Sequence, residues 1–71
     1  MVKYTIIIEK AKGNFSAYCP DLPGCIATGH TKDEAIRKIR EAIIFHLEGL
    51  KREKLAIPEP STQAADIEIS I

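Results

Sequence analysis

Apolar and polar side chains alternate near the start of the chain. A two-residue period is typical of a strand with one buried face, so we predict a strand over about residues 2–10. The apolar positions of this period are Val2, Tyr4, Ile6 and Ile8. Ile7 breaks the pattern, because it places an apolar side chain on the opposite face. Gly13 then predicts a hairpin turn into a second strand at about 14–19.

A proline-braced loop follows the second strand, with the sequence Tyr-Cys-Pro-Asp-Leu-Pro-Gly-Cys over residues 18–25. Pro20 and Pro23 have no N–H to donate to a strand ladder, so the second strand should stop there. Gly24 favours a tight turn back into a short third strand at about 25–29. These features predict a three-stranded antiparallel meander.

A capped amphipathic helix is predicted over about residues 32–53. Thr31 is a favourable N-cap residue, and Glu34 three positions later completes a capping box. Apolar residues then recur at helical spacing, which predicts one face buried against the sheet. That stripe consists of Ile36, Ile39, Ile43, Leu47 and Leu50.

The remaining residues suggest a surface segment followed by one more strand. Pro58 and Pro60 favour an extended crossing of the surface over residues 56–65. Residues 66–71 alternate again, with isoleucine at every second position, and predict a fourth strand. The fold class is therefore α+β, with β-β-β-α-β order in a single domain over residues 1–71. One helix covers one face of a small, antiparallel-type sheet.

Charge and composition exclude several classes of protein. The 71 residues carry equal numbers of acidic and basic side chains, which argues against a general nucleic-acid or membrane-surface binder. No apolar run approaches the roughly 20 residues that span a bilayer, and the first residues lack a signal-peptide pattern. We therefore expect a cytoplasmic protein. In that compartment Cys19 and Cys25 should be reduced, partly buried thiols.

The titratable residues do not form a recognisable catalytic pattern, so we expect no enzyme, no cofactor and no metal. A two-metal nuclease needs clustered carboxylates, whereas Asp21 lies in the loop and the strand carboxylates are scattered. Those strand carboxylates are Glu9, Asp66 and Glu68. Cys25 with His30 lacks an orienting third group. His46 is expected to be a half-buried packing residue.

Several of these segments together resemble the HicB antitoxin family. The matching segments are Pro20–Cys25, Gly29–Thr31, Glu34–Ala35, Leu47–Leu50 and Ile57–Ser61. The resemblance implies a partial RNase H fold and a role in a type II toxin–antitoxin system. It also implies a partner, a small RNA-cleaving HicA toxin whose catalytic surface the antitoxin covers. Many members continue into a DNA-binding domain, and no C-terminal domain of that kind is expected within these 71 residues.

The sequence predicts two interaction surfaces, one for a partner and one for self-association, and leaves one alternative function open. The partner-binding hypothesis places the toxin on the sheet face and the proline loop, at Tyr18, Asp21, Leu22, Pro23 and Gly24. Self-association is assigned to Ile44 and Phe45, which point away from the helical stripe, and predicts a homodimer or higher homo-oligomer. A structural role is assigned to Gly13, Gly24, Thr31 and Glu34. The alternative is a stand-alone RNA-binding or regulatory domain that uses Arg37, Arg40 and Lys51.

Overall fold

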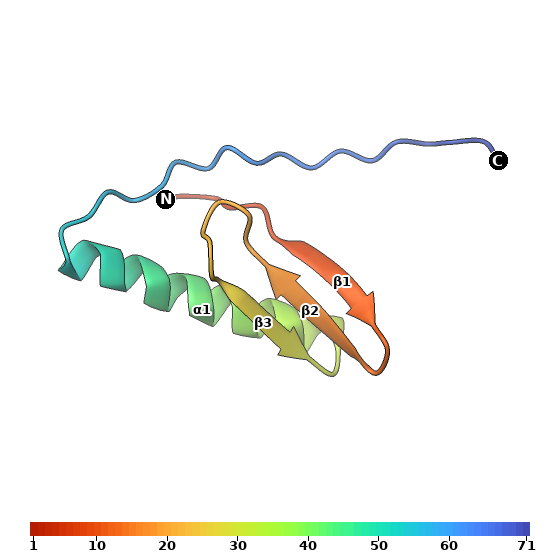
Figure 1. Cartoon of the computed structure of the whole chain (residues 1–71), viewed down its shortest axis with the longest axis horizontal. Coiled ribbons are helices and arrows are strands. Elements are labelled where there is room, and N and C mark those ends of the chain that lie inside the picture. The colour runs from red at the N-terminus through yellow and green to blue at the C-terminus, as the bar shows by residue number, and fades with distance from the viewer.

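Three antiparallel strands and one long helix form the body of the chain, in a computed structural model that describes all residues 1–71. The strands are β1 (Ile7–Ala11), β2 (Asn14–Tyr18) and β3 (Ile26–Gly29), in the sheet order β1-β2-β3. Helix α1 (Lys32–Arg52) lies across one face of this sheet (Figure 1). The predicted α+β arrangement of three strands followed by a helix is confirmed.

The strand register gives the sheet one covered and one open face. Ile8 pairs with Ala17, and Ala17 pairs with Ala27, so these side chains share the face beneath α1. The neighbouring positions point the other way. Ile7 pairs with Tyr18, which pairs with Ile26, and this row lies on the face that α1 does not cover.

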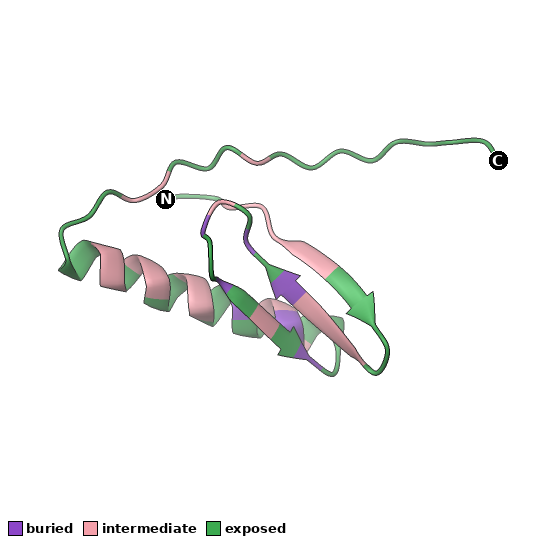
Figure 2. Cartoon of the chain, in the orientation of Figure 1, coloured by how far each residue is buried: buried purple, intermediate pink, exposed green.

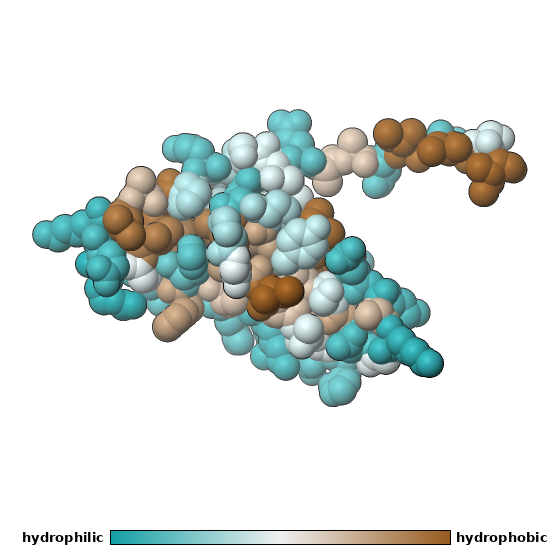
Figure 3. Space-filling view, viewed as in Figure 1, coloured by the Kyte–Doolittle hydropathy of each residue, from teal (hydrophilic) through white to brown (hydrophobic).

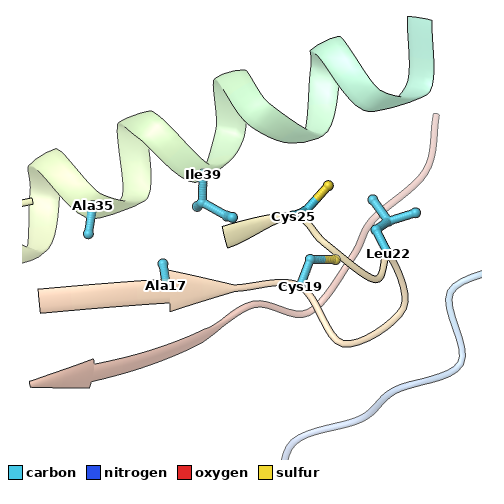
Figure 4. Packing of buried hydrophobic residues seen from close by; sticks show 6 residues of the cluster. All are labelled: Ala17, Cys19, Leu22, Cys25, Ala35 and Ile39. Carbon is cyan, nitrogen blue, oxygen red and sulfur yellow. The ribbon is translucent and has the colours of Figure 1, made fainter. Parts of the chain in front are cut away.

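A small core lies between the sheet and the helix. Its six buried side chains come from β2, the proline loop and the first half of α1 (Figure 2). Figure 4 shows the helix side chains pointing toward the sheet and the loop side chains gathered beside them. The cluster consists of Ala17, Cys19, Leu22, Cys25, Ala35 and Ile39.

Helix α1 is closed at both ends by specific hydrogen bonds. The Thr31 hydroxyl accepts from the Glu34 N–H at 3.0 Å, and the Glu34 carboxylate accepts from the His30 N–H at 3.0 Å. This second bond reaches one residue beyond the N-cap and lowers the pKa of Glu34. At the other end, Lys54 has a φ of 58°, and the Leu55 N–H donates to the Leu50 carbonyl, as in a Schellman motif. The helix has no stretch long and apolar enough to cross a membrane.

The first strand begins later than predicted. The ladder starts at Ile7 instead of residue 2, because β2 ends at Tyr18 and residues 2–6 lie opposite the proline loop. Pro20 falls in that loop and has no N–H for a ladder bond. Tyr4 and Ile6 still pack against the core, whereas Val2 is 50% exposed, so the predicted burial pattern holds only from Tyr4 onward.

The predicted fourth strand is wrong for the single chain. Residues 66–71 are extended but pair with no strand, and every residue from Gln63 to Ile71 is exposed. The segment leaves the body beside the start of β1 and runs outward (Figure 1). The radius of gyration is 14.0 Å, against about 11 Å for a compact domain of this length. The alternation of apolar and polar residues in this segment is typical of a strand, but a strand also needs a neighbouring strand to pair with, and the single chain offers none here.

Candidate protein-binding surface

The loop between β2 and β3 is a rigid, hydrogen-bonded turn. The Cys19 N–H donates to the Cys25 carbonyl at 3.2 Å, which closes the loop at its base. Within it, the Leu22 N–H donates to the Cys19 carbonyl, and the Cys25 N–H donates to the Leu22 carbonyl, each at 3.1 Å. Gly24 has a φ of 89°, a conformation that a side chain would strain. The loop therefore presents its outer side in one fixed shape.

Asp21 fixes this loop to residues forty positions later in the chain. One carboxylate oxygen accepts from the backbone N–H groups of Ser61 and Thr62, at 3.0 and 3.1 Å. The other accepts from the two hydroxyls, at 3.0 and 2.8 Å. The hydrogen bonds from Thr62, followed by those from Ser61, hold the pKa of Asp21 below its ordinary value. We call this set of four bonds the Asp21 clamp.

Two further contacts lead the segment from α1 to the clamp. The Tyr4 hydroxyl donates to the Pro58 carbonyl at 2.6 Å, and the Thr5 hydroxyl donates to the Thr62 carbonyl at 3.1 Å. The segment that the sequence assigned to a surface crossing is therefore held at three places. It supports the loop from outside.

Protonation of Asp21 should open the clamp, because a protonated carboxyl accepts these bonds less well. Its lowered pKa means that the clamp is complete above 3.8 and is lost as the pH falls through the lower folded-state pKa. We expect the NMR amide shifts of Ser61 and Thr62 to titrate with a midpoint below 3.8. Asp21→Asn should abolish that titration, whereas Glu68→Gln should leave it intact. A midpoint at or above 3.8 would contradict the clamp.

The open face of the sheet carries a row of apolar side chains beside this loop. Ile7, Tyr18 and Ile26 are aligned across all three strands. Tyr18 is 37% exposed and Ile26 is 64% exposed. The next row on the same face is polar and consists of Glu9, Ser16 and Thr28. We call the apolar row and the adjoining loop surface, residues 18–24, the open-face site.

The five residues predicted to bind a partner differ in their exposure to solvent. Tyr18 is exposed on the open face, and Pro23 and Gly24 are exposed in the loop, where Gly24 also lines a groove beside the helix. Leu22 is fully buried in the core, so its assignment as a contact residue is wrong. Asp21 is half-buried and turned toward its own chain through the clamp. Both residues shape the loop from within.

Sequence reasoning missed Ile26 as a surface residue. Ile26 lies in a predicted strand of only about five residues. Its alternation is too short to show which side chains face the helix and which face solvent. Ile7 was noted as an exception, and the register now explains it as the β1 member of the exposed row. The register that aligns Ile7 and Ile26 with Tyr18 was the missing information, because it places all three side chains in one row.

Ile44 and Phe45 are exposed on α1, at 47% and 73%, away from the open face. Phe45 and the half-buried His46 line a groove of about 420 Å³ between the helix end and the loop residues Gly24 and Cys25. Ile44 lines a different groove, on the β1 side of the helix. The two residues therefore line different grooves of the helix.

The structure separates Cys25 from His30. They flank the four-residue strand β3, and the five steps of extended chain between them span about 16 Å. Cys25 is buried, and this burial, followed by the influence of Cys19, raises the pKa of its thiol. Both cysteines are free, as expected for reduced thiols. No three His, Cys, Asp or Glu side chains are grouped so that they could hold a metal ion.

Comparisons with known proteins agree with this architecture. Residues 4–68 match the family model described as the HicB-like antitoxin of bacterial toxin–antitoxin systems. A UPF0150 protein of Thermoplasma acidophilum is 41% identical over 63 residues, which cover 87% of this chain and 91% of that protein. An uncharacterised 14.9 kDa protein of Haemophilus phage HP1 is 39% identical over 56 residues, covering 79% of this chain but only 42% of the phage protein.

A solved structure shows the same fold. A chain of a HicA3 and HicB3 toxin–antitoxin complex superimposes with a TM-score of 0.68 and 33% sequence identity. The match covers 84% of this chain and 70% of that chain. The family model alone spans more than half of the sequence. The chain belongs to the HicB-like antitoxin family.

Proposed function

We propose that this chain is an antitoxin that binds a HicA-like toxin in the cytoplasm and blocks the toxin's RNA-cleaving surface by steric cover. The chain itself contributes no chemistry to the inhibition. Family membership and the likeness to a chain of a toxin–antitoxin complex support the class of partner. The observation that carries the proposal is the open-face site, an apolar row beside a rigid loop.

The chemistry of this site suits a protein partner. Tyr18 at its centre offers a large apolar ring with a polar tip, the kind of side chain enriched at interface hot spots. Ile7 and Ile26 extend the apolar area on either side of it. Because α1 covers only the other face, a partner can reach this row directly (Figure 1).

Rigidity of the loop should favour tight binding. The loop is closed by backbone hydrogen bonds and fixed by the Asp21 clamp. Pro23 and Gly24 are therefore presented in their final positions before a partner arrives. Less conformational freedom is then lost on association, which improves affinity without adding contacts.

The open face does not suit RNA binding by the chain itself. Neither of its two rows contains a lysine or arginine, although phosphate contacts dominate nucleic-acid affinity. The basic residues of the helix are exposed, and Arg37 already pairs with Glu41 at 3.8 Å. The stand-alone RNA-binding role is the weaker alternative.

Calorimetric titration with a HicA-like toxin tests the site. Ile26→Asp places an unpaired charge within the proposed contact and should weaken binding at least about tenfold, as expected for a hot-spot change. Ile44→Asp makes the same isoleucine-to-aspartate change on the helix, where Ile44 is 47% exposed and lines grooves that contain no open-face residue, and it should leave the affinity within about threefold. Equal losses in both variants, or a loss only with Ile44→Asp, would overturn this assignment.

A further inference from the structure

The segment Asp66–Ile71 has the pattern of a strand but no strand beside it. Ile67, Ile69 and Ile71 are 82%, 71% and 117% exposed, and they alternate with three polar residues. Figure 3 shows this apolar group standing clear of the body. Three isoleucines on one side of an extended segment form an apolar surface, and its exposure to water is unfavourable in free energy.

The sheet offers a free edge that can receive a strand. β1 has β2 on one side only, so its outer N–H and C=O groups have no partner within the sheet. Just before β1, an apolar groove of about 470 Å³ runs between residues 1–6 and the helix. Its lining includes Ile6, Ile36, Ile43, Ile44 and Leu47.

The segment and the edge are complementary in pattern and in charge. A strand added beside β1 would turn one face toward the groove and the other toward solvent, which matches the strict alternation of residues 66–71. The first twelve residues carry three lysines and one glutamate. Residues 55–71 carry Glu59, Asp66 and Glu68 and no basic side chain.

We propose that Asp66–Ile71 of one copy of this chain adds as a strand along β1 and the residues just before it in a second copy, with its isoleucines over the apolar groove. The exchange is reciprocal in a two-fold dimer, because each copy has a free segment and a free β1 edge. The proposal does not depend on the toxin. It assigns a dimer contact separate from the open-face site.

The exit direction of the segment favours a second copy over its own strand. The Asp21 clamp fixes Ser61 and Thr62 at the loop. From there the chain diverges from β1 and does not fold back along it (Figure 1). An extended segment that leaves a fixed anchor is positioned to reach a neighbouring molecule.

Sedimentation equilibrium and backbone hydrogen exchange of the full chain test this. We expect a species of twice the 7.9 kDa chain mass, with slowed exchange in residues 7–11 and 66–71. Ile67→Lys with Ile69→Lys should give a monomer, with a loss of that protection by at least about tenfold. Gln63→Lys with Ala65→Lys adds the same charge to exposed positions and should remain a dimer.

Three results would overturn the proposal. A monomeric wild type with protected β1 would mean that the segment pairs with its own strand. A dimer that survives the isoleucine changes but is lost with Phe45→Ser would place the contact on the helix. A dimer with protection at β3 and not at β1 would assign the wrong edge. Unchanged helical circular dichroism in every variant shows that the monomer fold is intact.

Discussion

Leu22→Ala is expected to lower the free energy of unfolding by about 2–5 kcal/mol, the usual range for truncating a buried leucine. Leu22 is 0% exposed and packs with Cys19 and Cys25 beneath the proline loop. A small domain draws only about 3–5 kcal/mol from its core, so this variant should be largely unfolded at room temperature. Urea denaturation followed by circular dichroism measures the change.

Leu55→Ala is the matched control for this prediction. Leu55 is 59% exposed, so the same change of side chain should cost about 0.5 kcal/mol or less. If Leu22→Ala were as stable as wild type but lost partner binding, Leu22 would be a contact residue and its core role would be wrong.

Gly29→Ala should also destabilise the chain, by about 1–3 kcal/mol, as overpacking of a filled core does. A methyl group at Gly29 would lie 2.7 Å from the backbone nitrogen of Ala35 and 2.9 Å from the Glu34 Cβ. Backbone at the start of α1 cannot give way as a flexible side chain can. The helix must therefore move off the sheet, and thermal unfolding should show a lower midpoint.

Gly49→Ala is the matched control, because it makes the same substitution at a glycine where the added methyl group meets no clash. Gly49 lies inside α1, and the only atom near its added methyl group is a terminal nitrogen of Arg52 at 3.9 Å. Alanine should raise the stability by about 0.5–1 kcal/mol there, because glycine is unfavourable within a helix. Stabilisation by both alanines would contradict the close approach at Gly29.

Local signals in the sequence predicted most of the fold. Thr31 and Glu34 mark the helix start because capping depends on residues three apart, and the structure confirms their bond. Gly13 and Gly24 mark turns because each requires a positive φ, which both adopt, at 83° and 89°. The helical period reports burial directly, so Ile39 falls in the core as expected.

Contacts between distant residues could not be predicted in the same way. The Asp21 clamp joins positions forty apart, and neither the aspartate nor the serine and threonine carry a local sign of that pairing. Leu22 was assigned to the surface because a leucine between two prolines in a loop has no period that reveals its direction. Residues 66–71 showed a strand period, but the pattern contains no information about the molecule that supplies the partner strand.

The two interaction sites divide the surface by function. The open-face site is held by hydrogen bonds within one chain, whereas the strand at Asp66–Ile71 has no partner within it. Changes at one site should therefore leave the other intact. Ile26→Asp is expected to keep the dimer, and the isoleucine-to-lysine changes are expected to keep the open face.

Titration of a HicA-like toxin's RNA cleavage with this chain tests the central claim most directly. The proposed antitoxin should abolish cleavage near one chain per toxin, whereas Ile26→Asp at the same concentration should leave most of the activity. Undiminished cleavage at a several-fold excess of the folded wild-type chain would contradict the antitoxin function. Inhibition that persists fully in Ile26→Asp would contradict the open-face site.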